Sequence, residues 1–287
     1  MLVRPHELFA KAFNMQYALG AFNTSNLELT QAIIRAAEKT KSPVIVQTST
    51  GAVEYAGVNT IAGIVRSLAE EYSVPVVLHL DHGHSFEEIK ACIEAGYTSV
   101  MIDASAKKFE ENVRITNEVV NYAHERGVWV EAEIGALLGA EGAKGLGGMR
   151  TPDDMLTGAD EARKLVEATG VDSLAVAVGT IHGAFTGQEY IRFERLVEIE
   201  NLLPNTPLVL HGASGLASKH LEEAAATNVC KVNIDTELRI AFEEAIREYM
   251  KSSHEKVDPR DMLGLARDAV QVVVEEKIKV FGSVGKA

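Results

Sequence analysis

The chain has 287 residues, of which 46% are hydrophobic and 24% charged, as is typical of globular rather than disordered or fibrous proteins. The net charge of −13, from 41 acidic and 28 basic residues, argues against nucleic acid as a partner, because phosphate backbones bind clustered lysine and arginine. No apolar run approaches the roughly 20 residues that span a bilayer, and no signal-peptide pattern is present. With two cysteines and no disulfide framework, we expect a cytoplasmic protein without a membrane partner.

Short apolar runs alternate with longer amphipathic stretches along the chain. The apolar runs, which we expect to be strands, are Tyr17–Phe22, Val44–Thr48, Val76–Leu80, Ser99–Asp103, Val128–Glu133, Ser173–Val178, Leu208–Leu210 and Val229–Ile234. The stretches between them, which we expect to be helices, are Leu27–Lys39, Gly57–Tyr72, Phe86–Ala95, Phe109–Arg126, Ala159–Ala168, Phe193–Leu202, Ser218–Thr227 and Glu237–Lys251. Strands that alternate with helices form parallel βαβ units, whose strands are buried on both faces.

Eight such units predict an α/β fold of the (β/α)8 TIM-barrel type, as a single domain over residues 1–287. Asn26 and Ser85, each followed by an acidic first turn, are typical helix N-caps and support the predicted helices. We expect extra terminal helices at Pro5–Phe13 and Arg260–Lys277, the latter in a C-terminal extension from about residue 259. An open doubly wound sheet is less favoured, because no G-x-G-x-x-G motif follows the first strand.

Polar and ionisable residues end six consecutive predicted strands, at the rim where barrel enzymes carry their active sites. Three of them are histidines, His82, His182 and His211. Three neutral imidazoles with an open fourth position are a usual ligand set for catalytic zinc. A hydrogen-bonded structural role is the favoured interpretation of one such histidine, but not of three together. His79 lies inside its predicted strand and is expected to belong to the barrel core.

Glycines at the ends of the last three predicted strands indicate a phosphate site. Gly183, Gly212 and Gly215 would let the backbone approach a ligand, and Ser214 and Thr236 would supply hydroxyl donors. The loops after strands seven and eight are the usual phosphate site of such barrels. The alternative is that these glycines only form tight turns.

Two further features bear on the chemistry. The glycine-rich loop Gly135–Thr157 is long enough to be a mobile lid, although a loop without function is an equal alternative. No lysine at the strand ends is a good Schiff-base candidate, because Lys231 begins the last strand and is expected on the wrong side.

Four motifs together make a family resemblance. They are Leu78–Gly83 (LHLDHG), Gly179–Gly183 (GTIHG), His211–Gly215 (HGASG) and Asn233–Thr236 (NIDT). In this order they resemble the class II, zinc-dependent fructose-bisphosphate aldolase family and its tagatose-bisphosphate aldolase relatives, over nearly the whole chain. The resemblance implies a lyase of glycolysis and gluconeogenesis that reversibly cleaves fructose 1,6-bisphosphate to dihydroxyacetone phosphate and glyceraldehyde 3-phosphate. It also implies a homodimer or homotetramer.

The resemblance implies roles for metal and catalytic residues. His82, His182 and His211 resemble the zinc ligands. Asp103 and Glu133 resemble carboxylates at a second or alternate metal position, and a second divalent ion or a monovalent cation is a further possible cofactor. Asp81 resembles the acid that exchanges a proton with the aldehyde-derived oxygen, which requires a raised pKa that a dry site could supply. Glu141 matches a glutamate that removes the ketose C1 proton in some members.

The resemblance also implies a substrate site. At the dihydroxyacetone-phosphate end it comprises Gly183, Gly212, Ala213, Ser214, Asn233, Ile234, Asp235 and Thr236. Asn23 and Ser49 match positions near the other end of the bisphosphate. Arg260 resembles an arginine that reaches the distal phosphate, in some members from a neighbouring subunit.

The sequence departs from the family pattern in the loop after strand five, where Gly139-Ala140-Glu141 replaces a Gly-Gly-Glu-Glu-like run. Residues 106–108, Ala-Lys-Lys, replace a His-Leu-Pro-like run and add charge at the site. By the same resemblance, Asp235 favours fructose 1,6-bisphosphate as substrate, since tagatose-type members often have a small residue there, whereas Ala213 favours the tagatose isomer. A metal-dependent hydrolase on the same barrel, or an inactive zinc-binding barrel, are alternatives of other classes.

Overall fold

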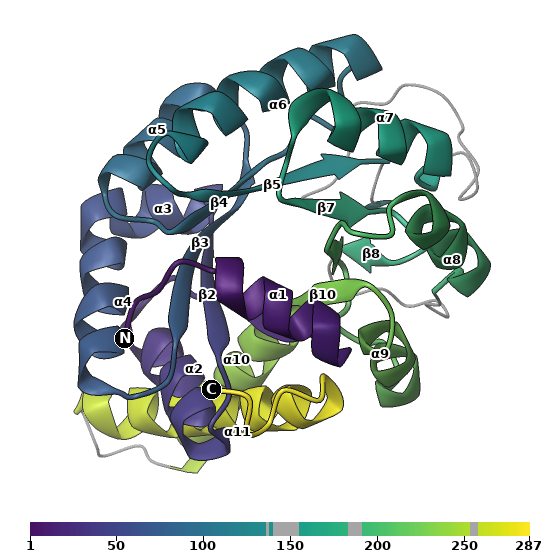
Figure 1. Cartoon of the computed structure of the whole chain (residues 1–287). Helices are drawn as coiled ribbons and strands as arrows, with labels where there is room; N and C mark the ends of the chain where they lie inside the picture. Colours follow the sequence, from purple (N-terminus) through teal and green to yellow (C-terminus); the bar gives the residue numbers. More distant parts are fainter. Residues whose placement is uncertain (136–137, 140–154, 183–190, 253–257) are drawn as a thin grey trace.

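The computed structural model describes residues 1–135, 138–139, 155–182, 191–252 and 258–287 (Figure 1). Eight parallel strands form a closed barrel: β1 (Leu19–Asn23), β2 (Val44–Ser49), β3 (Val76–Gly83), β4 (Ser99–Ile102), β5 (Trp129–Ile134), β7 (Ser173–Val176), β9 (Leu208–Leu210) and β10 (Val229–Ile234). Strand β1 pairs with both β2 and β10, which closes the barrel. The predicted (β/α)8 fold is confirmed.

Helices surround the barrel. They are α1 (His6–Met15), α2 (Leu27–Thr40), α3 (Thr50–Ala56), α4 (Val58–Glu71), α5 (Phe86–Glu94), α6 (Phe109–His124), α7 (Ala159–Thr169), α8 (Phe193–Leu202), α9 (Ser218–Ala225), α10 (Thr236–Ser252) and α11 (Pro259–Val280). Every predicted helix is present, with ends that differ by a few residues. Helix α11 is the predicted C-terminal extension and packs against α2 and α10 at the bottom of Figure 1. Among the described helices, none is both long and apolar enough to cross a membrane.

One short helix and one pair of short strands were not predicted. Helix α3 follows β2 directly, and the Ser49 hydroxyl caps it by accepting a hydrogen bond from the Ala52 amide. Strands β6 (Leu138–Gly139) and β8 (Ile181–His182) form a separate parallel pair. They continue the chain beyond β5 and β7, so the end of the sixth predicted strand lies beside the start of the glycine-rich loop.

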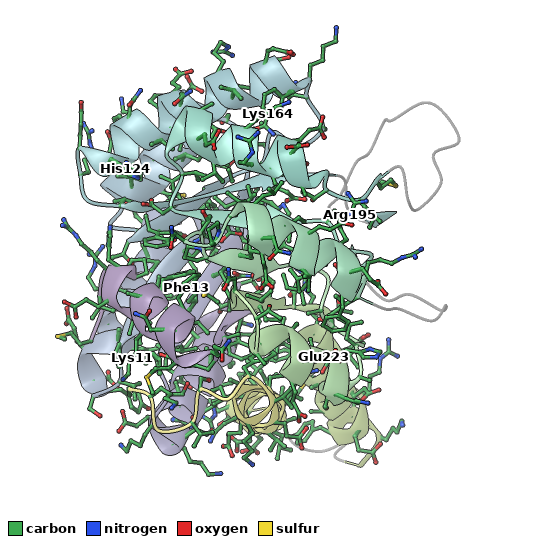
Figure 2. All side chains as sticks on the ribbon, turned by 45° about the vertical axis from the view of Figure 1, so that its right-hand side comes forward. Lys11, Phe13, His124, Lys164, Arg195 and Glu223 are labelled. Atoms are coloured by element: carbon green, nitrogen blue, oxygen red, sulfur yellow. The ribbon has the colours of Figure 1, made fainter. Side chains whose placement is uncertain are left out.

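The apolar core has two layers separated by the barrel wall. Side chains that point outward from the strands pack against the helices, whose charged residues face solvent, as Lys164 of α7 and Glu223 of α9 do in Figure 2. The N-terminal end of the barrel is closed by α1, which lies across the strands in Figure 1. There Phe9 stacks on Trp129 with ring centroids 4.5 Å apart. A ligand cavity is therefore left to the C-terminal end.

The barrel interior changes from apolar to polar along the strands. Side chains that face inward recur every second residue. Near the N-terminal end they are apolar and belong to two small clusters that include Ile45, Val77 and Val209. Nearer the C-terminal end they are polar or charged, and all are buried: Asn23, Gln47, His79, Asp81, Glu131, Glu133, His211, Lys231 and Asn233. Because buried polar groups need partners, the upper half of the barrel forms a network rather than a packed apolar core.

At Gly83, the last residue of β3, the neighbouring strand β4 approaches closely. A Cβ atom at Gly83 would lie 2.7 Å from the Met101 carbonyl oxygen, a backbone atom that cannot move aside. We predict that Gly83→Ala lowers the free energy of unfolding by about 1–3 kcal/mol, as overpacking does. The matched control is Gly63→Ala on α4, where a Cβ would meet no atom within 4 Å. Urea unfolding should show the control unchanged or up to about 1 kcal/mol more stable, and equal stability of the two variants would contradict the account.

Candidate active site

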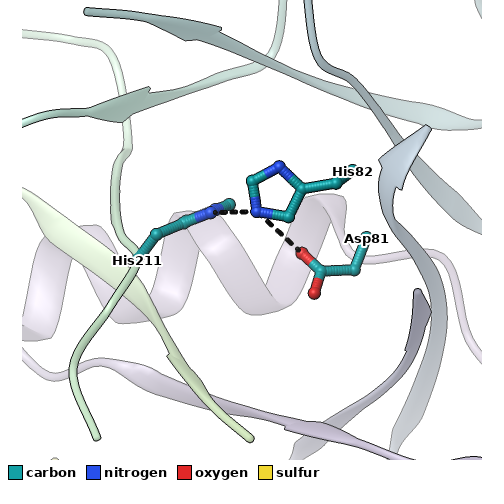
Figure 3. A group of neighbouring side chains, drawn as sticks. All are labelled: Asp81, His82 and His211. Carbon is teal, nitrogen blue, oxygen red and sulfur yellow. Dashed lines mark hydrogen bonds and ion pairs between the residues drawn. The ribbon is translucent and has the colours of Figure 1, made fainter. Parts of the chain in front are cut away.

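Asp81 and His82 are consecutive residues of β3, yet both side chains point into the barrel (Figure 3). A regular strand would send them to opposite faces. The pairing of β3 with β4 shifts register between Leu80 and Gly83, and His82 has a φ of 50°, in the left-handed region. Bulges of this kind redirect side chains next to active sites. Thr50 donates a hydrogen bond to the His82 carbonyl oxygen at 3.0 Å and helps to hold the unusual backbone.

His82 lies between two sets of polar groups. Its Nε2 atom is 3.0 Å from Nδ1 of His211, which reaches across from the end of β9 (Figure 3), and 4.0 Å from Oδ1 of Asp81. Its Nδ1 atom is 3.0 Å from Oδ2 of Asp103 and 3.6 Å from Oε2 of Glu133. Asp81, His82 and His211 therefore form one group that could hold a metal ion, and His82, Asp103 and Glu133 form another.

The carboxylates make this place attractive to a cation. Burial by itself lowers the pKa of His82, but Asp81, Asp103 and Glu133 outweigh it and raise the pKa to about 10. A protonated His82 can donate from both ring nitrogens, which matches the two 3.0 Å contacts with Asp103 and His211. Burial, assisted by Asp103, raises the pKa of Glu133 well above its usual value, and its buried Oε2 atom accepts no hydrogen bond.

These donors fit a divalent metal. Imidazole nitrogens and carboxylate oxygens are the ligands that zinc takes in catalytic sites. The proton on His82 supplies one positive charge among carboxylates where an ion would supply two, and ligand protons leave when a metal binds.

Asp81 is held as a carboxylate by three amides. Its Oδ2 atom accepts hydrogen bonds from Asn23 at 3.0 Å and Gln47 at 3.1 Å, and its Oδ1 atom accepts one from Asn233 at 3.0 Å. Burial would raise its pKa, but His82 and other nearby positive groups, with these hydrogen bonds, lower the pKa to about 2. A proton-donating Asp81 would require a raised pKa, whereas the three hydrogen bonds that these amides donate favour its carboxylate form. In the structure Asp81 is a proton acceptor.

A buried ion pair between Lys231 and Glu131 lies below this group. Lys231 was expected on the wrong side for chemistry, but its side chain is fully buried inside the barrel and pairs with Glu131 at 2.9 Å. Glu131 also lies 2.8 Å from Nε2 of His211. The inward direction of Lys231 could have been predicted from strand alternation, because Lys231 and Asn233 are two residues apart in β10 and share a face. His79 lies in the same layer, in the barrel core as predicted, bonded to the Ser99 hydroxyl at 2.7 Å.

A cavity of about 950 Å³ opens above the metal-ligand groups. The predicted site residues that line it are Asn23, Ser49, His82, Asp103 and Asp235. Arg239, which the sequence analysis missed, lines it too and pairs with Asp235 at 2.6 Å. Arg239 could have been found from its spacing, because it lies four residues after Asp235 and residues four apart at the start of a helix are neighbours.

Arg260, in contrast, is not among the residues that line this cavity. Its side chain is 89% exposed and pairs with Asp258 at the start of α11. Within one chain, therefore, Arg260 does not reach the site for which it was predicted.

The ends of β9 and β10 lie together, as the predicted phosphate site requires. The Ser214 hydroxyl accepts a hydrogen bond from the Asp235 amide at 3.4 Å, and Gly212 has a φ of 62°, which suits a glycine. Thr236 is the first residue of α10. The nearby Gly215 amide donates to a Glu237 carboxylate oxygen at 2.8 Å, so an anionic group already lies against this turn.

Two members of that predicted site can contribute only their backbones. The side chains of Ala213 and Ile234 are fully buried in the apolar layer between barrel and helices. Ile234 faces away from the barrel interior because it follows the inward-facing Asn233 in β10, and neighbouring residues of a strand alternate between its two faces.

Three predicted residues are not fully described. Glu141 and Gly183 lie outside the described residues, and only the backbone of His182 is described, in β8, where it pairs with Gly139 of β6. Their roles stay predictions.

Comparison with known proteins agrees with this geometry. A family model described as "Fructose-bisphosphate aldolase class-II" matches residues 3–286. A fructose-bisphosphate aldolase from Geobacillus stearothermophilus is 45% identical, covering 100% of this chain and 99% of that protein. A fructose-bisphosphate aldolase from Thermus caldophilus is 44% identical over the full length of both.

Solved structures agree as well. The YdjI aldolase from Escherichia coli K12 superposes with a TM-score of 0.88 at 37% identity, covering 100% of both chains. A fructose-bisphosphate aldolase from Campylobacter jejuni gives a TM-score of 0.84 at 25% identity, covering 100% of this chain and 97% of that one. The chain belongs to the class II fructose-bisphosphate aldolase family.

Proposed function

We propose that the protein reversibly cleaves fructose 1,6-bisphosphate to dihydroxyacetone phosphate and glyceraldehyde 3-phosphate. The observation that carries this proposal is the buried group of Asp81, His82 and His211, of which His82 lines the cavity, in a member of this aldolase family. Cleavage between C3 and C4 needs a base for the C4 hydroxyl and a positive centre for the charge that develops on the ketose fragment. In this group, Asp81 would accept the proton, and His82 and His211 would bind the cation.

Zinc is the ion that this donor set favours. His82 and His211 would hold it, with His182 as the third imidazole ligand. When bound, the ion supplies Lewis-acid stabilisation of negative charge on the substrate oxygens. Asp103 and Glu133, on the other side of His82, would hold a second divalent ion, an alternate position of the first, or a monovalent cation. The buried Glu133 Oε2 atom, which accepts no hydrogen bond, supports that assignment.

Asp81 is the group that would move the proton. As a carboxylate it would accept the C4 hydroxyl proton in cleavage, and it would return that proton to the aldehyde oxygen in condensation. Asn23, Gln47 and Asn233 hold its two oxygens and leave little freedom of rotation. Glu141 is proposed as the base for the ketose C1 proton.

The two phosphate groups would lie at opposite ends of the cavity. Gly183, Gly212 to Ser214 and Asn233 to Thr236 would bind the dihydroxyacetone-phosphate end through backbone amides and hydroxyls, at the start of α10. Asn23 and Ser49 would contact the other end. Arg239 adds a cationic side chain to the cavity wall, which an anionic substrate requires in a chain of net charge −13.

The environment and assembly follow from other observations. Cys92 and Cys230 are both buried and unpaired, which supports a reducing compartment such as the cytoplasm.

Arg260 does not line the cavity of its own chain, so a contribution to the distal phosphate would have to come from a second copy. We therefore infer a homodimer or homotetramer.

Removal of metal tests the first part of the proposal. Dialysis against a chelator should abolish cleavage, and added Zn²⁺ should restore it. His211→Ala should lower the zinc content measured by mass spectrometry, whereas His124→Ala, an exposed histidine on α6, should leave it unchanged. Full activity of a protein shown to be free of metal would contradict the proposal.

Replacement of the proton acceptor tests the second part. Asp81→Ala should lower kcat by about 10²–10⁴, the usual contribution of a general acid–base group, while zinc content stays the same. Asp268→Ala, an exposed aspartate on α11, is the matched control and should have normal kcat. If Asp81→Ala turned over within a few-fold of the unaltered protein, Asp81 would have no part in the proton transfer.

A coupled assay that detects triose phosphates identifies the substrate. Fructose 1,6-bisphosphate should give a higher kcat/KM than tagatose 1,6-bisphosphate, which differs only in configuration at C4, the carbon whose hydroxyl faces the base. The opposite order would make the protein a tagatose-bisphosphate aldolase. Release of inorganic phosphate without triose phosphates would instead indicate a metal-dependent hydrolase.

A further inference from the structure

A buried ion pair lies directly beneath the metal-ligand group. Glu131 of β5 and Lys231 of β10 are both fully buried, and Nζ of Lys231 lies 3.2 and 2.9 Å from Oε1 and Oε2 of Glu131. Neither residue is among those that line the described walls of the cavity. The pair therefore meets the site only through other side chains.

Stability does not account for this ion pair. Moving two charges out of water is costly, and apolar residues of similar volume in their place often leave a protein as stable or more stable. Removal of one partner is harmful, because the remaining charge is buried without compensation. A pair of this kind inside a barrel therefore points to a task that one of its members performs on a neighbouring group.

The neighbouring group is His211. Its Nε2 atom lies 2.8 Å from Oε1 of Glu131, and because a carboxylate only accepts hydrogen bonds, Nε2 is the donor. A neutral imidazole that carries its proton on Nε2 has its lone pair on Nδ1. That atom lies 3.0 Å from Nε2 of His82 and faces the metal-ligand group. Such hydrogen bonds fix the tautomer and the ring orientation of metal-binding histidines.

We propose that Glu131 and Lys231 are positioning residues for the metal site. Glu131 holds His211 with Nδ1 directed at the ion, and Lys231 holds Glu131. Because Lys231 donates to both carboxylate oxygens, the carboxylate cannot turn away from His211 and its charge stays balanced where water does not reach. The proposal rests on the proposed zinc-dependent function and adds to it the groups that determine how tightly the ion is held.

Two variants separate this role from a structural one: Glu131→Gln and the double variant Glu131→Leu/Lys231→Met. Zinc affinity is measured by competition with a coloured chelator, and stability by urea unfolding of the metal-free protein. Glu131→Gln and the double variant should bind zinc about 10–100-fold more weakly, as loss of a carboxylate behind a histidine ligand does elsewhere. The double variant should nevertheless unfold near the urea concentration of the unaltered protein, because it leaves no charge unpaired.

In the double variant we therefore expect the stability of the unaltered protein together with weaker zinc binding. The apolar pair fills the space but gives His211 no hydrogen-bond acceptor. Lys39→Met is the matched control: it removes an ion pair of 2.8 Å with Glu275, away from the barrel interior, and should leave zinc affinity unchanged. The absorption spectrum of the Co²⁺-loaded protein gives an independent reading of ligand geometry, and it should change in the double variant and not in the control.

The outcomes distinguish this inference from the proposed function. If the double variant binds zinc as tightly as the unaltered protein, the positioning role is wrong and the aldolase proposal stands. If the double variant does not fold, Glu131→Gln decides the question, since it keeps the side-chain shape, and normal zinc affinity in that variant overturns the inference. If the unaltered protein itself binds no zinc, the proposed function fails first.

Discussion

The C-terminal half of the barrel depends on one electrostatic constraint: charges that are removed from water must be paired. Lys231 balances Glu131 in the lowest polar layer, and Glu131 in turn orients His211. Above them His82 lies within reach of carboxylates on both sides of its ring, and amide groups fix Asp81. The interior is consequently a continuous chain of hydrogen bonds from β10 to β4. A cation at its top would complete the balance, because the carboxylates around His82 outnumber the positive charge there.

The second constraint is local and concerns the backbone of β3. A catalytic carboxylate and a metal ligand on consecutive residues cannot both reach a barrel interior from a regular strand. The register shift after Leu80 and the left-handed φ of His82 solve this problem, and the close approach of Gly83 to Met101 leaves no room for a side chain there. Backbone strain of this kind persists only where the surroundings impose it, and it occurs often at functional sites.

Much of this could be predicted from the sequence, for identifiable reasons. Strands buried on both faces appear as apolar runs, and polar residues at their C-terminal ends pointed to the rim where Asp81, His82 and His211 meet. The bulge could not be predicted, because periodicity carries no information on a single left-handed residue. The contact between Glu131 and Lys231 could not be predicted, because the two residues are 100 positions apart and pair across the barrel, which no local pattern encodes.

In the proposed site, imidazole groups from separate strands hold a zinc ion above Asp81. X-ray absorption at the zinc edge, recorded on the zinc-loaded protein, measures those ligands directly. The account predicts scattering from three imidazole nitrogens at about 2.0–2.1 Å, reduced by one imidazole in His211→Ala. A spectrum without imidazole scattering, or one that His211→Ala leaves unchanged, would contradict it.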